Sequence, residues 1–439
     1  MLDILVERRS VGMGYRILLA GGNLIDHHGK VHRKNLLIED GLISYVGDEE
    51  IEADVVYNCE NKYISPSFVN LHTHSPMNLF KGIAEDVNID SWFNDIIWPY
   101  ESKLKAEDIY HSARIAAAEM IENGVSAYGD HYMFPEEIIK AALDVGIKID
   151  LAPTLFSVGG GFDEGLKNTL NLFEKYKDST NVRISLGPHS PYTCTEEDLS
   201  KVSNIAEEYK LKIHIHVSET QDQVDASLKE KGLTPIEVLH RAGYLNHKVI
   251  IAHGLYVTDE DIQYINDNIT FAISPKTYLK LNMGLGNILK HKDKVNISIG
   301  TDGAASSNTL DPLEQVRLLG LIGKFASGDS TEYSVEALWS YLMKGHEILQ
   351  FNSGKLEEGY SADLIIWDLN LPNTQVNNNV LASIIYSANS KNIEATMVSG
   401  KFVKENGKVK IDVTDSINYC NERINAMIRE GRGKTNLRY

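Results

Sequence analysis

The sequence predicts an α/β fold, a (β/α)8 TIM-like barrel joined to a small β-sandwich domain built from both chain ends. Two observations predict it. In residues 65–355, eight short apolar segments alternate with helical patterns, which is typical of parallel strands wound into a barrel. Residues 1–64 and 356–439 instead carry short strand-like segments with turn signals, so we expect them to form the appended domain.

The barrel strands are expected where short apolar runs are bounded by turn or helix signals. Asn123-Gly124 and Ala242-Gly243 are typical helix ends between such runs. The predicted strands are Phe68–Leu71, Val125–Gly129, Lys148–Pro153, Val182–Leu186, Lys212–Val217, Val249–Ala252, Ile269–Ile273 and Ile297–Gly300. The predicted helices are Ala106–Asn123, Glu196–Tyr209, Pro235–Ala242 and Glu332–Leu349.

The small domain is predicted from β-type segments at both ends of the chain. Asp40-Gly41 is a strong hairpin signal between two of these segments. The expected strands are Tyr15–Leu19, Asn35–Glu39, Leu42–Val46, Ala362–Asp368 and Ala395–Val398.

Composition excludes several classes of partner. The formal net charge of -18 disfavours nucleic acid and anionic membrane surfaces, which require a basic face, and leaves a small-molecule substrate. Three widely spaced cysteines, Cys59, Cys194 and Cys420, are expected to be buried, inert thiols rather than metal ligands. Residues 1–9 lack the pattern of a signal peptide, and no apolar stretch is long enough for a membrane span, so we expect a cytoplasmic protein.

Polar residues cluster at the ends of the predicted barrel strands. His72 and His74 are two residues apart on the first strand, so both side chains project to one face and both imidazoles can reach one ion. Three further residues end the fifth, sixth and eighth strands: His216, His253 and Asp302. Catalytic groups of such barrels lie at these strand ends. A single histidine there is more often structural, but five residues in this order predict a metal site for zinc, iron, manganese or nickel.

These motifs resemble the amidohydrolase superfamily and, within it, the methylthioadenosine/S-adenosylhomocysteine deaminase branch. The match spans roughly residues 15–410. The segments that carry it are Pro66–His74, Lys81–Asp86, Gly187–Tyr192, His216–Thr220, Gly300–Ser306 and Gly359–Leu364.

The resemblance implies a hydrolytic deaminase of an adenosine-like nucleoside. A divalent metal ion, expected to be zinc, lowers the pKa of a bound water toward neutrality, and the resulting hydroxide attacks the ring carbon and releases ammonia. Asp302 is expected to ligate the metal and accept the water proton, and Glu219 to shuttle a proton to the ring nitrogen and the leaving ammonia. His253 either ligates the metal or polarises the substrate. The fourth strand ends at His189, and no lysine is placed like the bridging carboxylated lysine of the two-metal relatives, which favours one metal ion.

The substrate contacts implied by the resemblance are Glu85 for the ribose hydroxyls, His189, and Ser306 for the base. A solvated charge at Glu85 and a structural His189 remain alternatives. Trp92 and Trp98 flank the Glu85 segment and are expected to pack in the core or in an interface rather than stack on substrate.

The sequence departs from the branch after the third strand. Relatives that accept S-adenosylhomocysteine present arginines there, whereas this chain has none and carries Asp163 and Glu164, which would repel a carboxylate. We therefore expect adenosine, 5′-deoxyadenosine or methylthioadenosine to be better substrates. Two further departures are expected to reshape the pocket: the seventh strand ends in the segment Ser274–Leu281, where relatives usually carry a Ser-Asn pair, and His131 stands where relatives usually have an apolar residue.

Two other interpretations stay open at the sequence level. One is an aminohydrolase or chlorohydrolase of the same superfamily that acts on a free purine, a pterin or a triazine. The other is a non-catalytic metal-binding relative. Similar proteins also form homo-oligomers, which implies a self-pairing surface here.

Overall fold

Parallel strands form the barrel of the computed structural model, which describes residues 15–439. They coincide with the eight predicted segments, the fourth being split between β9 and β10. The strands are β6 (Phe68–Thr73), β7 (Val125–Tyr132), β8 (Lys148–Leu155), β9 (Val182–Ile184), β10 (Gly187–Pro188), β11 (Ile213–Val217), β12 (Val249–His253), β13 (Ile269–Ile273) and β14 (Asn296–Ile299). A bridge between Leu186 and Ile213 links the two halves of the sheet. The Thr301 N–H donates to His72 O (3.0 Å), which joins the last strand to the first.

Helices follow the strands, and the four predicted helices are confirmed as α3, α6, α8 and α12. Gly124, predicted as part of a helix end, adopts a φ of 80° just after α3, and Thr234 and Glu237 form a capping box at the start of α8. The helices of the barrel region are α3 (Ala106–Glu122), α4 (Pro135–Val145), α5 (Phe162–Tyr176), α6 (Glu196–Tyr209), α7 (Gln221–Lys231), α8 (Pro235–Arg241), α9 (Pro275–Lys280), α10 (Ala304–Ser307), α11 (Pro312–Ser327) and α12 (Val335–Leu349).

An irregular segment lies between β6 and α3. It runs through the 3-10 turn η1 (Ser75–Phe80), the short helix α1 (Ile89–Ser91), the π-helical turn η2 (Trp92–Ile97) and α2 (Trp98–Glu101). Residues 89–101 of this segment stand beside the barrel mouth.

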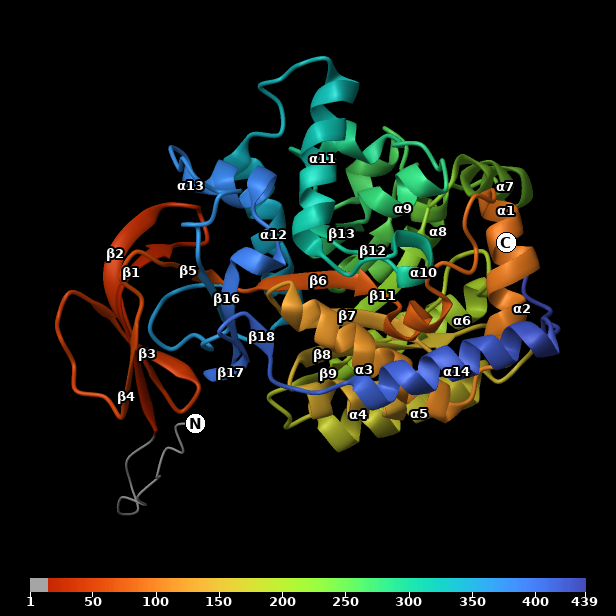
Figure 1. The fold of residues 1–439 in the computed structure, drawn as a ribbon. Coiled ribbons are helices and arrows are strands. Elements are labelled where there is room, and N and C mark those ends of the chain that lie inside the picture. The colour runs from red at the N-terminus through yellow and green to blue at the C-terminus, as the bar shows by residue number, and fades with distance from the viewer. Residues whose placement is uncertain (1–14) are drawn as a thin grey trace.

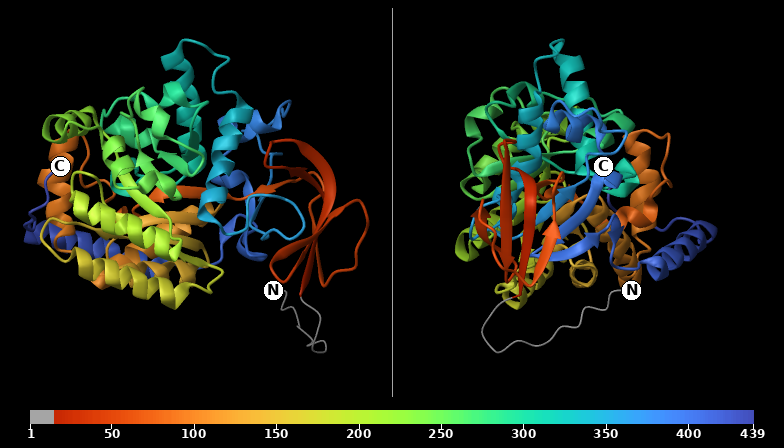
Figure 2. Two further views of the ribbon diagram at one scale, coloured as in Figure 1. Left: turned by 180° about the vertical axis from the view of Figure 1, so that it is seen from behind. Right: turned by 60° about the vertical axis from the view of Figure 1, so that its left-hand side comes forward.

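Both ends of the chain combine in one nine-stranded sheet at one end of the barrel (Figures 1 and 2). Its order is β18-β17-β16-β15-β5-β1-β2-β3, with β4 paired to β1. Its strands are β1 (Arg16–Ile25), β2 (Val31–Glu39), β3 (Leu42–Gly47), β4 (Val55–Asn58), β5 (Tyr63–Pro66), β15 (Leu364–Trp367), β16 (Ile393–Val398), β17 (Lys401–Glu405) and β18 (Lys408–Val409). The Asp40-Gly41 hairpin is confirmed. The sandwich arrangement and the boundaries at 64/65 and 355/356 stay predictions.

Residues 414–430 depart from the predicted β domain. They form the helix α14 (Thr414–Glu430), which leaves the sheet and lies along α3 of the barrel (Figure 1). The physical reason is an ion pair with a buried acid: Arg423 Nε lies 2.9 Å from Asp108 Oδ1, and the Tyr419 hydroxyl donates to the same oxygen (2.7 Å). Because α3 supplies the partner, the chain after residue 413 belongs with the barrel surface.

A buried ion pair fastens the sheet to the bottom of the barrel. Lys148 Nζ, at the start of β8, lies 2.6 Å from Asp363 Oδ2, just before β15, and also donates to Ser361 Oγ (2.9 Å). Both charged groups are buried, so each depends on the other for its hydrogen bonds.

Three further predictions concern the cysteines, membrane-spanning helices and a signal peptide. Cys59, Cys194 and Cys420 are buried and free, as predicted. Among residues 15–439, no helix has both the length and the apolar character that crossing a membrane requires. The segment used to judge a signal peptide, residues 1–9, lies outside the described residues.

Candidate active site

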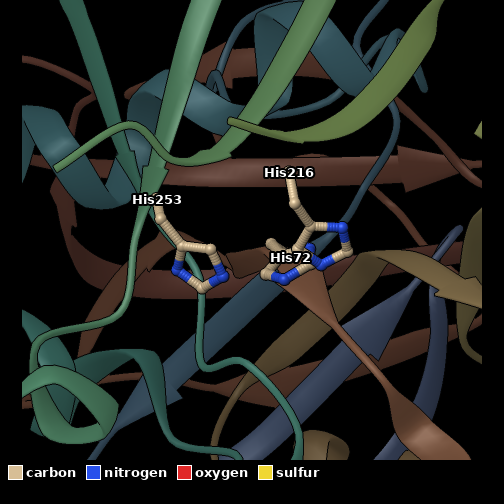
Figure 3. A group of neighbouring side chains, drawn as sticks. All are labelled: His72, His216 and His253. Carbon is tan, nitrogen blue, oxygen red and sulfur yellow. The ribbon is translucent and has the colours of Figure 1, made fainter. Parts of the chain in front are cut away.

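The five predicted strand-end residues come together at the carboxyl ends of the barrel strands. His72 belongs to β6, His216 to β11 and His253 to β12, and Figure 3 shows the three rings turned toward a common space. Asp302 follows β14, and its Oδ1 lies 3.8 Å from His72 Nε2 and 3.4 Å from His74 Nε2. His216 Nε2 is 3.3 Å from His74 Nε2.

The donor set fits a metal ion. Two groups, His72–His216–His253 and His72–His74–Asp302, each have ligating atoms within 4.8 Å of one another, and they share His72. The His72 Nε2 atom is buried and has no hydrogen-bond partner among residues 15–439. A buried nitrogen without a partner is costly, and a metal ion at this position would satisfy it.

Each histidine is oriented by a contact at its other ring nitrogen. His74 Nδ1 lies 2.6 Å from the carbonyl oxygen of His131, and His216 Nδ1 lies 2.9 Å from that of His189. His72 Nδ1 meets His214 Nε2 at 2.9 Å. Such contacts fix the tautomer and aim Nε2 at the cluster. The sequence analysis missed His214, although its spacing of two from His216 places both on one strand face.

His72, His216 and His253 have lowered pKa values, which favours the neutral form that binds metals. Burial is the first cause and lowers the pKa of His72 and of His216 well below the usual value, with the neighbouring imidazoles as further causes. Burial also lowers the pKa of His253 to about 4, although Asp302 opposes this shift. Neutral imidazole is the form with a free lone pair for a ligand.

Asp302 is positioned by its backbone and by two hydrogen bonds. Its φ of 59° lies in the left-handed region, which turns the chain sharply after β14. The Gly303 N–H donates to Oδ1 (2.8 Å), and the Ser306 hydroxyl donates to Oδ2 (2.9 Å). Ser306 thus contacts the catalytic aspartate candidate and also Thr277 Oγ1 (2.9 Å).

Glu219 is a buried acid beside the cluster. Ser218 takes a φ of 49°, and this turn after β11 brings the Glu219 Oε1 atom to 3.6 Å from His253 Nε2. Burial, and secondly the charge of Asp302, raise the pKa of Glu219 to about 8. A carboxyl group whose pKa is raised, lying beside the cluster, is suited to exchange a proton with a bound molecule.

A narrow, largely aromatic pocket stands over the cluster. The volume open to the centre of a water molecule is about 50 Å³, and none of the described residues that line it is a lysine or arginine. The lining is His74, Met77, Trp92, Phe93, Trp98, Glu101, His131, Tyr132, Met133, Thr154, Phe156, His189, Tyr192, His216, Glu219, His253, Thr277, Leu281, Asp302 and Ser306.

The pocket includes most of the predicted substrate residues but not Glu85. His189 lines it, with its ring 4.8 Å from that of Phe156. Glu85 lies outside, where Lys280 Nζ is 2.8 Å from its Oε2 and the Asn308 amide donates to its Oε1 (2.9 Å). Trp92 and Trp98 are nearly buried, as expected for packing residues, yet both line the pocket.

Glu101 is the acidic residue that the sequence analysis missed. It lies at the end of α2, lines the pocket, and accepts a hydrogen bond from the Tyr132 hydroxyl. Burial raises its pKa to about 7. It follows no strand, so the strand-end rule gave no signal, but the apolar Trp98-Pro99-Tyr100 run before it marks a buried segment.

The fold and the cluster define a class: an α/β barrel protein with a divalent-metal site at the carboxyl ends of its strands. The model of the amidohydrolase family matches residues 63–403. The chain therefore belongs to the amidohydrolase family and is a hydrolase.

Two curated relatives and one solved structure illustrate the similarity. A 5-methylthioadenosine/S-adenosylhomocysteine deaminase of Dictyoglomus turgidum is 36% identical over 404 residues, 90% of this chain and 95% of the relative. A 5′-deoxyadenosine deaminase of Methanobrevibacter smithii is 36% identical over 387 residues, 85% of this chain and 89% of the relative. A zinc-bound adenosine deaminase of Xanthomonas campestris superposes with a TM-score of 0.90 at 24% identity, over 94% of this chain and 99% of that one, which confirms the fold.

Proposed function

We propose that this protein is a metal-dependent deaminase of adenosine-like nucleosides. The observation that carries the proposal is Glu219, a buried carboxyl group in the wall of the pocket that lies 3.6 Å from His253, beside the metal-site cluster. Deamination of an adenine ring requires such a proton donor next to an activated water. The deaminase activities named for the two curated relatives support this reaction.

The proposed metal ligands are His72, His74, His216 and Asp302, with His253 adjacent. A bound divalent ion lowers the pKa of water and so supplies a nucleophile at neutral pH. We propose zinc, which accepts imidazole and carboxylate ligands and is the ion bound in the structurally similar adenosine deaminase.

The protein's own groups move the protons. We propose that Asp302 accepts a proton from the attacking water, and the hydrogen bonds from Ser306 and the Gly303 amide to its two oxygens support this role by fixing the carboxylate. Glu219 donates its proton to the ring nitrogen as water adds at the ring carbon. Proton transfer from the former water to the amino group then lets ammonia leave and a ring carbonyl form. His253, held by Tyr278 (3.2 Å), either ligates the ion or polarises the attacked carbon.

We propose that Glu101 rather than Glu85 accepts the ribose hydroxyls. A carboxylate can accept both protons of a cis-diol, and Glu101 is the one of these two acids that lines the pocket. His189 and Ser306 are proposed to contact the base. Glu85 is already engaged by Lys280 and Asn308.

The pocket favours a neutral 5′ group. Its described lining has acids but no lysine or arginine to pair with an amino-acid carboxylate. The expected repulsion from Asp163 and Glu164 does not arise in the lining itself, because Asp163 lies outside the pocket and pairs with Lys201 (3.1 Å). We therefore propose adenosine, 5′-deoxyadenosine or methylthioadenosine as substrates ahead of S-adenosylhomocysteine.

We further propose a cytoplasmic location, which the three free buried thiols support. The self-pairing surface implied by similar proteins stays a prediction.

Ammonia release by the purified protein with zinc tests the function. The panel holds adenosine, 5′-deoxyadenosine, methylthioadenosine, S-adenosylhomocysteine, guanine and a melamine-type triazine. We expect turnover of the first three. Turnover confined to guanine or the triazine would replace the nucleoside assignment with the free-base or triazine alternative, and no turnover of any compound would favour a binding role.

A further inference from the structure

The segment after α14 reaches the mouth of the catalytic pocket. It crosses the irregular segment beside the barrel, where the Gly433 N–H donates to Pro99 O (3.0 Å) and Lys103 Nζ donates to Gly431 O (2.9 Å). The Tyr439 N–H then donates to Asn94 Oδ1 (3.0 Å). Figure 1 accordingly places this end of the chain beside α1 and α2. These contacts bring residue 439 to the segment that carries Phe93 and Glu101.

Tyr439 packs on two aromatic residues of the pocket wall. Its ring stacks on that of Phe93, with centroids 4.4 Å apart and planes at 11°. It also meets Tyr192 edge-on, with centroids 6.3 Å apart. Phe93 and Tyr192 both line the catalytic pocket. Tyr439 therefore packs against the outer side of the pocket wall that Phe93 and Tyr192 form.

A larger cavity lies on the other side of that wall. It offers about 750 Å³ to the centre of a water molecule, against about 50 Å³ in the catalytic pocket. Tyr439 and Tyr192 line this outer cavity, together with Ser218 and Thr220 of the turn that carries Glu219. Tyr192 lines both spaces, so they adjoin at this residue, and Tyr439 contacts it from the side of the outer cavity.

We propose that Tyr439 sets the upper size limit for the 5′ substituent of the nucleoside. This inference rests on the proposed function. With the base held at the metal cluster and the ribose at Glu101, the wall left for the 5′ group includes Phe93 and Tyr192. Stacking by Tyr439 fixes that wall and closes the way into the outer cavity. Without the ring, a bulky neutral 5′ group gains room.

Kinetics with two substrates tests the proposal. The ratio of kcat/KM for an adenosine with a 5′-benzylthio group to that for 5′-deoxyadenosine is measured in the unaltered protein, in Tyr439→Ala and in Tyr439→Phe. We expect the ratio to rise about tenfold in Tyr439→Ala, since pocket room for a few apolar atoms discriminates by that order. Tyr439→Phe keeps the ring and should keep the ratio. An equal fall for both substrates, or an unchanged ratio in Tyr439→Ala, would overturn the proposal.

Acrylamide quenching of tryptophan fluorescence separates this inference from the proposed function. Of the four tryptophans, Trp92 and Trp98 line the pocket, whereas Trp339 and Trp367 are 0% exposed. We expect acrylamide to quench Trp92 and Trp98 more strongly in Tyr439→Ala than in the unaltered protein. Quenching in Tyr439→Phe should equal that in the unaltered protein. If the unaltered protein turned over no nucleoside, the proposed function would fall, while quenching would still decide whether Tyr439 closes the pocket.

Discussion

The strand-end cluster and the segment 89–101 build the two halves of the pocket in different ways. His72, His216 and Asp302 sit at the ends of regular barrel strands, where topology alone fixes which side chains meet. Glu101 sits in an irregular run of short helical turns, and only packing against the barrel brings it to the pocket. The proposed proton transfers thus depend on strand-end residues and the proposed ribose contact on the irregular segment, so substitutions in the two regions should have different signatures.

Metal removal should reduce activity the most, because the strand-end cluster then has no ion to activate water. Dialysis against a zinc chelator is expected to reduce ammonia release to background, and added zinc to restore it. The melting temperature should also fall, since an ion bound only to the folded state stabilises it. Elemental analysis and a thermal melt check both results; full turnover in a preparation without metal would refute this assignment of the cluster.

Asp302→Asn should come next in size. The amide keeps the shape of the side chain but cannot accept the water proton, so kcat is expected to fall by about 10³-fold, with a smaller change in KM. His32→Ala, an exposed histidine on the distant sheet, serves as the control and should retain activity. A loss below tenfold in Asp302→Asn would argue that another group takes the proton.

A pair of glutamate variants tests the recognition half. Glu101→Gln is expected to lower kcat/KM for adenosine about 100-fold, because charge-assisted hydrogen bonds to two hydroxyls are weakened, whereas Glu85→Gln should change it less than about threefold. With 2′,3′-dideoxyadenosine, the Glu101→Gln penalty should largely disappear. The reverse order of the two variants would restore Glu85 as the ribose contact.

The pH profile gives the smallest effect. Burial raises the pKa of Glu101 to about 7, so the carboxylate that is proposed to accept the ribose hydroxyls is lost as pH falls below that value. Below pH 7, kcat/KM for adenosine should therefore decrease by up to about tenfold per pH unit. In Glu101→Gln this decrease of kcat/KM below pH 7 should be absent. Its persistence in the variant would assign the titration to a different group.

The strand-end residues could be predicted from the sequence, whereas the residues placed by long-range packing could not. The barrel strands and the five residues at their ends were predictable because apolar runs and strand ends leave a local pattern. Glu101 was not, because its burial against Tyr132 depends on residues 31 positions away. The role of α14 was hidden for the same reason: its partner, Asp108, is more than 300 residues earlier in the chain.

The nine-stranded sheet has a consequence for how the chain folds during synthesis. β5 pairs with β15, and Lys62 forms an ion pair with Asp368, 306 residues further along the chain. At roughly 5–20 residues per second, the β15 partner leaves the ribosome about 15–60 s after β5. During that interval the N-terminal strands expose an unpaired edge, which is prone to join other nascent chains. Slower translation of the barrel would lengthen that exposure, so the yield of folded protein should depend on the speed of the ribosome as well as on stability.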